Sequence, residues 1–489
     1  MHKNDVYIGK KCKNIPSLEI KSFLMAYKIR NYEQIVDRVF ARLYNENVFP
    51  HNYSIERMIF LKTTVKKMDY DQVMALPRGK HWTPKKPNFF WRSLVRAISG
   101  LGMGGCKLDA TIEGLDRIDK DEPCLILMNH TCFADMPIVY QLLYPRPFNI
   151  VCTNDGFIGY WGIMGWAMQQ IGCFPTQKFV TDLSLVQDME YCFKKLKSSV
   201  LMYPEASYSF DGTATTLPRK FGVLLKKFDV PVIMIETREL YLRNPLYNEL
   251  QIRKGANAKV RAYVLYTREE IREKSVKELS DGVDEAFNFD HFKWQKEHGL
   301  EIHDDFRADG LHRILYKCPN CGAEEKTEGR GIYLTCHHCG KQYEMTPLGE
   351  LKATEGETEI AHVPDWYRWE REQVRQEILD GTYCLDEDVT IAMQVDYKAI
   401  YMVGEGHLTH DRNGFHLTGC DGRLDYTQKP QSCYSLYSDY YWYEIDDMVC
   451  IGDNEVHYFC FPKNKSVSVA KLRLATEEMY KLYKARKLS

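Results

Sequence analysis

The sequence lacks several features that would assign it to a class at once. It shows no basic start followed by a short apolar run and a small-residue cleavage site, so we expect no secretory signal peptide and a cytoplasmic location. It also lacks a long internal repeat and any low-complexity tract, which argues against solenoid and fibrous proteins. With 44% hydrophobic and 27% charged residues, the 489-residue chain has the composition of a folded protein, and its length predicts two to four domains.

A convincing membrane-spanning run is missing as well. The best candidate is the uncharged stretch 156–177, which includes five glycines, one proline and three glutamines. A crossing needs roughly 20 predominantly apolar residues, and this stretch is interrupted too often to be typical of one. We therefore expect a buried or interfacial helix here, and a protein that lies on a membrane rather than through it.

Charge is unevenly distributed along the chain. Residues 1–100 carry 19 Lys and Arg against 8 Asp and Glu, or +11, so that the net charge of −2 leaves −13 for the remainder. A basic N-terminal part suits an anionic membrane surface or nucleic acid, and an ordinary basic helical surface explains it equally well.

Cysteine, by contrast, is plentiful, with sixteen residues. In a reducing compartment clustered cysteines indicate metal ligands rather than disulfides. Two CxxC pairs, separated by fourteen residues, meet this description: Cys318 with Cys321, and Cys336 with Cys339. Four thiolates would complete a closed tetrahedral shell for a structural Zn²⁺, as in a zinc ribbon, which we place at 312–345.

The flanking glycines Gly322 and Gly340 suit the tight turns that follow such pairs, and His337 or His338 is an alternative fourth ligand. The ribbon would fold on its metal, and its mixed flanking charges favour a role in joining domains over nucleic-acid binding. Docking of a partner stays open as a third role.

The pattern of the rest of the chain predicts three further regions. Residues 1–88 favour helices, with apolar positions at helical spacing in 35–43. In 89–305 short apolar runs at 124–128, 200–203 and 230–235 alternate with helical patterns, which is typical of an α/β sheet domain. In 346–489 a helix near 366–379 precedes short strands and a terminal helix, an order that loosely resembles a pleckstrin-homology-type barrel.

One short segment carries the main chemistry. Residues 129–135 read NHTCFAD and directly follow the first predicted strand. On a regular helix His130 and Asp135 would lie roughly 140° apart, so they meet only if His130 occupies the strand-to-helix turn and Asp135 begins the helix. A carboxylate-oriented histidine is the arrangement of a general base. A second such spacing, His416 to Asp421, has no companion motif and is discounted.

Three other blocks accompany this segment, namely GCFPTQK at 172–178, YPEAS at 203–207 and VPVI at 230–233. Together, in this order, the four blocks resemble the 1-acylglycerol-3-phosphate acyltransferase family of glycerolipid acyltransferases over roughly 105–275. That family shows Asn-His-x4-Asp, a Gly-containing block ending in arginine, Pro-Glu-Gly-Thr and Val-Pro-Val. The resemblance implies transfer of an acyl group from coenzyme A or acyl carrier protein to a lysophospholipid or glycerolipid hydroxyl.

The resemblance also implies roles for individual residues. His130 would be the general base and Asp135 its orienting carboxylate. The acceptor would be positioned by Lys178, Glu205, Ala206, Ser207 and Lys220. Cys132 as a nucleophile is an alternative, and it stands where the family often has serine.

The chain departs from the family pattern at four positions in or beside these blocks. Lysine replaces arginine at 178, alanine replaces glycine at 206, serine replaces threonine at 207, and tyrosine stands at 208 where a second arginine is common. Because lysine offers phosphate only a point charge, these losses weaken the implication of a lysophosphatidate acceptor, and residues 219 and 220 are other sources of charge. The alternative hypothesis is a non-catalytic acyltransferase fold that binds lipid or protein through its ribbon and C-terminal domain.

Overall fold

The computed structural model describes residues 63–486, except 103–105, 133, 160–162, 181, 219, 250 and 444. By its internal contacts the chain divides into two compact units, Met1–Ile59 and Phe60–Ser489. The helix expected at 35–43 lies outside the described residues. Of the region 1–88, the described part holds β1 (Val65–Lys67) and the short helix α5 (Tyr70–Met74).

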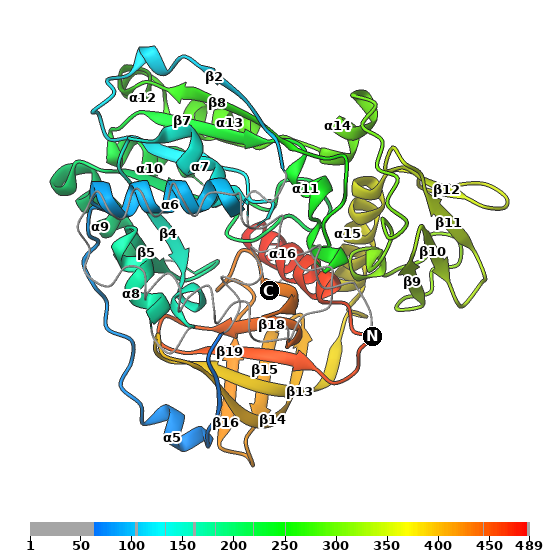
Figure 1. Cartoon of the computed structure of the whole chain (residues 1–489). Coiled ribbons are helices and arrows are strands. Elements are labelled where there is room, and N and C mark those ends of the chain that lie inside the picture. The colour runs from blue at the N-terminus through cyan, green and yellow to red at the C-terminus, as the bar shows by residue number, and fades with distance from the viewer. Residues whose placement is uncertain are drawn as a thin grey trace, which may run out of the picture. The chain divides into compact units, whose positions relative to one another are not determined.

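A seven-stranded sheet forms the first layer of the second unit (Figure 1). Its strands, in spatial order, are β2 (Leu108–Glu113), β8 (Ala258–Tyr266), β7 (Val232–Thr237), β3 (Leu125–Met128), β6 (Ser199–Met202), β4 (Phe148–Thr153) and β5 (Cys173–Thr176). The strands from β7 to β5 run parallel, whereas β8 is antiparallel to β7 and parallel to β2. The three expected strands are therefore present.

Both faces of this sheet are covered. Every residue of β3 is buried, and its alternate side chains enter different cores: Ile126 belongs to one cluster and Leu127 to the other. Continuous apolar runs of this kind are typical of parallel strands buried on both sides. The helices of this region are α6 (Phe89–Gly102), α7 (Asp135–Leu143), α8 (Ile163–Gln170), α9 (Leu183–Tyr191), α10 (Phe221–Phe228), α11 (Leu240–Arg243), α12 (Arg268–Glu273), α13 (Val276–Ala286) and α14 (His291–Glu297). The α/β class is confirmed.

The uncharged run 156–177 is not one helix. Its described part forms the eight-residue α8 and then strand β5, which pairs with β4. Gly172 has φ +87°, a left-handed conformation that ends the helix and turns the chain into the strand. Among the residues that the structure describes, no helix combines the length and the apolar character required to cross a bilayer.

A small four-stranded antiparallel sheet follows, with strands in the order β12 (Leu351–Ala353), β11 (Gln342–Met345), β10 (Tyr333–Cys336) and β9 (Thr327–Arg330). The helix expected near 366–379 is α15 (Val363–Asp380), and it contacts the C-terminal helix α16 (Val469–Lys484) (Figure 1). Trp366 of α15 is fully buried and donates its indole N–H to the backbone oxygen of Lys317 (3.0 Å), which ties α15 to the start of the cysteine-containing segment.

Between α15 and α16 the chain forms β13 (Leu385–Gln394), β14 (Ile400–Asp411), β15 (Gly414–Gly419), β16 (Leu424–Gln428), β17 (Tyr437–Trp442), β18 (Asp446–Gly452) and β19 (His457–Pro462). These strands pair antiparallel in the order β16, β15, β14, β13, β19, β18, β17, and β1 adds to β14 in parallel. Strands followed by a terminal helix are the expected order, and the pleckstrin-homology-like assignment remains a prediction.

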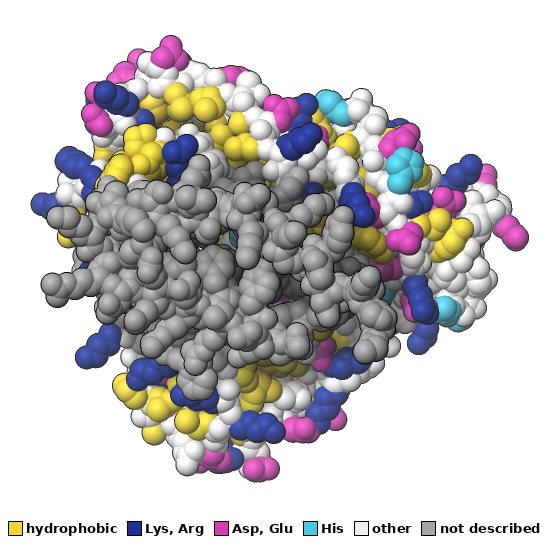
Figure 2. Space-filling view, in the orientation of Figure 1, with side chains coloured by type: hydrophobic (Ala, Val, Ile, Leu, Met, Phe, Trp, Pro, Cys, Tyr) yellow, Lys and Arg dark blue, Asp and Glu magenta, His cyan; other side chains and the backbone are white. Residues whose placement is uncertain are grey.

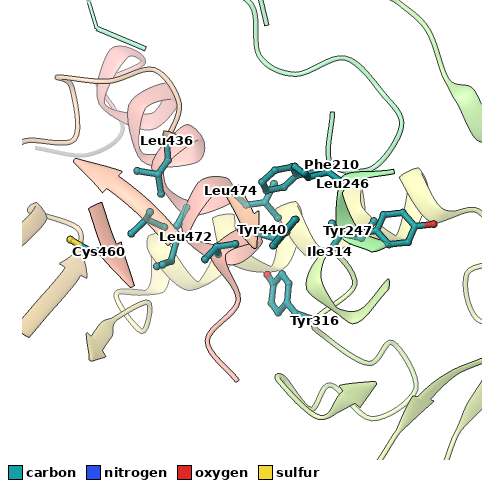
Figure 3. Packing of buried hydrophobic residues seen from close by; sticks show 14 of the residues in the cluster. Phe210, Leu246, Tyr247, Ile314, Tyr316, Leu436, Tyr440, Cys460, Leu472 and Leu474 are labelled. Atoms are coloured by element: carbon teal, nitrogen blue, oxygen red, sulfur yellow. The ribbon is translucent and has the colours of Figure 1, made fainter. Parts of the chain in front are cut away.

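One of the hydrophobic clusters joins the α/β region, the cysteine-containing segment and the C-terminal part. Figure 3 shows part of it: Phe210 and Tyr247, from the polypeptide that follows β6 and β7, pack in the same cluster as Tyr316, which precedes the cysteines, and Tyr440 and Leu472 from the C-terminal part. Buried apolar area of this extent resists separation, since each fully buried large side chain contributes roughly 1.5–3 kcal/mol. The C-terminal elements are therefore packed against the polypeptide of the α/β region itself.

Candidate active site

The central feature of the site is the turn between β3 and α7. Asn129, fully buried, fixes this turn to the neighbouring strand β7: its amide donates to the backbone oxygen of Thr237 (3.0 Å) and accepts from the backbone N–H of Thr237 (2.8 Å). These two hydrogen bonds satisfy the buried amide, which would otherwise be unfavourable, and they hold the end of β3 in place. His130 follows directly, at the position the sequence predicts for it.

The carboxylate of Asp135, the first residue of α7, reaches back to this turn. Its Oδ2 lies 2.9 Å from Nδ1 of His130 and also accepts the backbone N–H groups of Thr131 (2.7 Å) and Cys132 (3.2 Å). Its Oδ1 accepts the hydroxyl of Thr131 (2.7 Å). Asp135 is 1% exposed, whereas the His130 side chain is 23% exposed. The structure thus brings the two residues together, with the carboxylate inside and the imidazole reaching solvent.

Two aromatic rings hold the imidazole. The ring of Tyr203 stacks on that of His130 with 4.2 Å between centroids, and the ring of Tyr208 lies at the same centroid distance, tilted by 44°. Burial between these rings lowers the pKa of His130 below its ordinary value, although Asp135 opposes the shift. A neutral imidazole, able to accept a proton, is therefore favoured near pH 7.

Glu205 supports the same turn from the segment after β6. Its Oε2 accepts the backbone N–H of His130 (2.8 Å), and its Oε1 accepts the backbone N–H of Thr215 (2.9 Å). The side chain is fully buried, and this burial raises the pKa of Glu205 to about 8 despite both N–H groups. Its described bonds make Glu205 a brace for the backbone around His130.

The next residue adopts a backbone conformation that favours glycine. Ala206 has φ +55°, in the left-handed region, where its N–H donates to the backbone oxygen of Tyr203 (3.0 Å) in a tight turn. This conformation costs a residue with a Cβ roughly 1–2 kcal/mol. The turn is retained here with alanine at the cost of that strain.

Ser207 receives a partner that the sequence motif does not contain. Nη2 of Arg473, on α16, donates to Oγ of Ser207 (2.9 Å), and the guanidinium lies 4.4 Å from the ring centroid of Phe210. Arg473 is 3% exposed and pairs with Glu477 one turn later on its own helix (3.4 Å). The chain lacks an arginine at position 208 but places one from its C-terminal helix against the same segment.

Lys178, at the end of the GCFPTQK block, also contacts the C-terminal part. Its ammonium lies 3.7 Å from the ring centroid of Tyr437 on β17. The hydroxyl of Tyr437 donates to Asp155 (2.8 Å), as does that of Tyr443 (3.2 Å). Lys178 is therefore not a solvated lysine but part of a cluster between the two regions.

The charged groups of this cluster shift one another's pKa values. Burial lowers the pKa of Lys178, and the nearby carboxylates of Asp155 and Asp439 oppose that shift. Burial alone would raise the pKa of Asp155, but Lys178 and the two tyrosine hydroxyls hold it below its ordinary value. Burial raises the pKa of Asp439 to about 7. The charge of Lys178 is thus offset by Asp155 of the α/β region and by Asp439 of the C-terminal part.

The remaining candidates lie elsewhere. Lys220 is exposed at the start of α10, with no described hydrogen bond or ion pair to the residues above, and residue 219 lies outside the described part. Cys132 is 3% exposed and its backbone N–H bonds to Asp135, so its thiol is not presented to solvent. In the second His-x4-Asp spacing, His416 bonds to Asp425 (2.9 Å), while Asp421 is 97% exposed.

The four predicted cysteine ligands converge. Their Sγ atoms all lie within 4.8 Å of one another, with 3.8 Å from Cys318 to Cys339 and 3.8 Å from Cys321 to Cys336. A tetrahedral ion with bonds of about 2.3 Å to sulfur requires edges of about 3.8 Å, so the thiolate spacing fits a metal of that size. His337 bonds instead to Glu328 (2.8 Å), and neither His337 nor His338 belongs to the converging group.

The turns around these cysteines also have the expected form. Gly322 and Gly340, at φ +74° and +76°, donate their N–H groups to the backbone oxygens of Cys318 (2.8 Å) and Cys336 (2.9 Å). Left-handed glycines are needed at such turns because a Cβ would be strained there. The cluster can hold a structural metal ion.

Comparison with known proteins finds a family match within the α/β region. Residues 109–235 match the family model described as Acyltransferase. The chain therefore contains an acyltransferase-family domain. No curated protein matches this chain. Among solved structures, it is similar to the 1-acyl-sn-glycerophosphate (LPA) acyltransferase PlsC from Thermotoga maritima, with 18% identity, a TM-score of 0.30, and coverage of 40% of this chain and 76% of that chain. Likeness of this degree does not define a substrate.

Proposed function

We propose that this protein is an O-acyltransferase that moves a fatty acyl group from a thioester to a hydroxyl of a lysophospholipid or glycerolipid. The observation that carries the proposal is the 2.9 Å contact between Nδ1 of His130 and Oδ2 of Asp135 within an acyltransferase-family domain. With Nδ1 held by the carboxylate, Nε2 is the ring nitrogen that accepts the proton. The lowered pKa of His130 supplies the neutral form that a base requires.

In the proposed reaction, His130 removes the proton of the acceptor hydroxyl as its oxygen attacks the thioester carbonyl. The new C–O bond forms, the C–S bond breaks, and the proton passes to the departing thiolate of coenzyme A or acyl carrier protein. Asp135 keeps the imidazole in the correct tautomer and stabilises its cationic form. Glu205, Ala206 and Ser207 shape the turn beside the imidazole.

Removal of His130 tests this proposal. The His130→Ala variant should lose thioester turnover by roughly 10²–10⁴-fold, because general base catalysis contributes about that much. His416→Ala is the matched control, since His416 also bonds a carboxylate but lies in the C-terminal sheet. Turnover is followed by thiol release from acyl-coenzyme A with monoacylglycerol and lysophospholipid acceptors. Equal rates for wild type and His130→Ala would instead favour the binding-module hypothesis.

The metal that we assign to the cysteine cluster is Zn²⁺ in a structural role. The ligands would be Cys318, Cys321, Cys336 and Cys339, which leave no coordination position for a reacting water. The surrounding small sheet packs on α15, whose Trp366 binds the backbone at Lys317. This supports a bracing role between domains over recognition of nucleic acid.

A peripheral position at the inner face of the membrane is also proposed. Helix α6 carries Phe89, 48% exposed, and its Trp91 packs against Trp166 of α8, which is 54% exposed (5.5 Å between ring centroids). Arg92 of α6 lies 6.0 Å from the ring centroid of Phe89. On the face in view, Figure 2 shows hydrophobic side chains interspersed with basic and acidic ones. Exposed aromatics with basic neighbours are typical of surfaces that enter the lipid headgroup region.

A further inference from the structure

A cavity lies near the candidate active site, and its wall combines elements of two regions of the chain. It has a volume of about 280 Å³ and lies between α15, α16 and the segment 210–216. The segment 210–216 lies within the matched acyltransferase region, whereas both helices belong to the C-terminal part. The reaction proposed above makes no use of this cavity.

Positive charge predominates in the cavity wall. Its charged lining residues are the cations Arg368, Arg371, Arg473 and Lys481 and the carboxylates Asp211 and Glu477. Both oxygens of Asp211 accept the hydroxyl of Thr213 (3.0 Å each), so this carboxylate is turned to its own loop. Thr215 donates its hydroxyl to the backbone oxygen of Glu205 (3.1 Å), so Thr216 contributes the remaining threonine hydroxyl of the wall.

Arg473 has a donor that no described group satisfies. Its Nη2 binds Ser207 and its Nε faces Glu477, but its buried Nη1 has no hydrogen-bond partner among the described residues. An unpartnered charged donor inside a protein is unfavourable, more so than a neutral one. A ligand oxygen in the cavity that Arg473 lines would remove this cost.

A second arginine points to the same ligand chemistry. Arg371 donates through one nitrogen, Nη1, to both Glu477 (2.7 Å) and Glu478 (3.1 Å). Lys481, one turn along α16, pairs with Glu478 (2.7 Å) and is 36% exposed. Two guanidinium groups, an ammonium and the hydroxyl of Thr216 suit an anion with several oxygens, because guanidinium binds phosphate through a planar pair of N–H groups.

The cavity is coupled to the catalytic turn. Thr215, in its wall, donates its N–H to Glu205 (2.9 Å), and Glu205 in turn accepts the N–H of His130 (2.8 Å). Arg473 meets the same segment at Ser207. A ligand in the cavity that contacts Thr215 would therefore be separated by Glu205 alone from the backbone of His130.

We propose that the cavity between α15, α16 and the segment 210–216 is a binding site for a phosphate group, with Arg473 and Arg371 as its principal donors. The phosphate can belong to a lysophospholipid headgroup, to coenzyme A, or to a free ion. Binding itself does not depend on the acyl-transfer proposal, so each can fail without the other.

The first experiment measures binding of inorganic phosphate to the full chain by titration calorimetry at constant ionic strength. Lys481→Gln should weaken binding about threefold to fivefold, as expected for a partly exposed charge. Arg473→Gln should weaken it roughly tenfold or more. Lys484→Gln is the matched control, an exposed lysine on the same helix outside the cavity, and should bind as wild type does.

Because Arg473→Gln removes a buried group and can fail to fold, Thr216→Val provides a second, milder change in the wall. It should also weaken binding while its unfolding midpoint stays near that of wild type. Absence of phosphate binding to wild type overturns the proposal. So does equal affinity among Lys481→Gln, Thr216→Val and Lys484→Gln.

A second experiment identifies the source of the phosphate. Turnover by Lys481→Gln is compared for lysophosphatidate against monoacylglycerol, and for acyl-coenzyme A against acyl-pantetheine. A loss confined to the phosphorylated acceptor assigns the cavity to the lipid headgroup, and a loss confined to coenzyme A assigns it to the donor. Weakened phosphate binding with unchanged turnover on every pair assigns it to a free phosphate effector.

Discussion

The ammonium of Lys178 lies 3.7 Å from the ring centroid of Tyr437, across the boundary between the acyltransferase-family domain and the C-terminal sheet. Tyr437 in turn donates its hydroxyl to Asp155, which belongs to the short turn after β4. The C-terminal part therefore contacts residues of the acyltransferase-family domain that belong to the candidate site. This relationship makes the C-terminal domain testable as part of the site.

Two replacements of Tyr437 should lower the rate of acyl transfer to different degrees. Tyr437→Phe keeps the ring over Lys178 but loses the bond to Asp155, whereas Tyr437→Leu loses both. A contact between a cation and a ring contributes about 0.5–2 kcal/mol, so Tyr437→Leu should reduce kcat/KM by roughly twofold to thirtyfold and exceed the loss in Tyr437→Phe. Tyr426→Leu, in the same sheet, is the control. Equal kinetics for all three would remove Tyr437 from the site.

Asp135→Asn should reduce both stability and turnover. The carboxylate accepts from the N–H groups of Thr131 and Cys132, from the Thr131 hydroxyl and from His130, and the amide replaces one acceptor by a donor. We expect about 2–4 kcal/mol less stability and at least a roughly hundredfold loss of kcat. Urea unfolding and thiol release measure these effects.

Asp421→Asn is the control for that change, because Asp421 shares the spacing from a histidine but is 97% exposed. It should leave the urea midpoint and kcat as they are. If Asp135→Asn behaved like Asp421→Asn, the carboxylate would have no orienting role.

Glu205 should make stability depend on pH in a defined direction. Burial raises its folded-state pKa to about 8, whereas the unfolded value is near 4.5. Between these values the unfolded chain has lost the proton that the folded chain keeps, so rising pH favours unfolding, by at most about 1.4 kcal/mol per pH unit. Glu205→Gln cannot ionise, and its stability relative to wild type should rise from pH 5 to pH 8. A pH-independent difference in unfolding midpoints would show that Glu205 is ionised in the folded protein.

The sequence predicted those parts of the site that depend on neighbours along the chain. The strand before His130 is a run of buried apolar residues, and the turn to Asp135 is only five residues long, so both can be recognised from local spacing. The cysteine ligands are predictable for the same reason, since each pair is local and closes its own turn.

Contacts between distant segments gave no comparable signal. Arg473 and Ser207 are 266 positions apart, and Tyr437 and Asp155 are 282 apart, with no motif at Arg473 or Tyr437. An arginine on a helix surface looks the same in sequence whether it faces water or a buried serine. Strand β5 escaped prediction because its residues lie inside a longer uncharged run whose division into helix and strand depends on pairing with β4.

Membrane association should depend on the exposed aromatics of α6 and α8. Phe89→Ser and Trp166→Ser should each weaken co-sedimentation with phosphatidylglycerol vesicles roughly tenfold or more, because burying one large apolar side chain contributes roughly 1.5–3 kcal/mol. Leu379→Ser, 46% exposed on α15, is the matched control and should sediment as wild type does. If the two aromatic variants and the control sediment alike, this surface does not contact lipid.

The cysteine cluster should contain one Zn²⁺ per chain, and its removal should affect more than the small sheet. Lys317, just before the first ligand, pairs with Glu377 of α15 (3.1 Å), and Lys471 of α16 pairs with Glu324 between the two cysteine pairs (2.6 Å).

Because a segment of this size depends on its metal for folding, Cys336→Ser should lose the ion, lower the thermal midpoint and expose 318–345 to proteolysis. Cys384→Ser, an exposed cysteine outside the cluster, is the control for mass-spectrometric metal content and for unfolding. Since α16 carries Arg473 to Ser207, acyl transfer should fall together with the zinc content. A metal-free wild-type protein with full stability would show that these four thiols need no ion to hold the segment together.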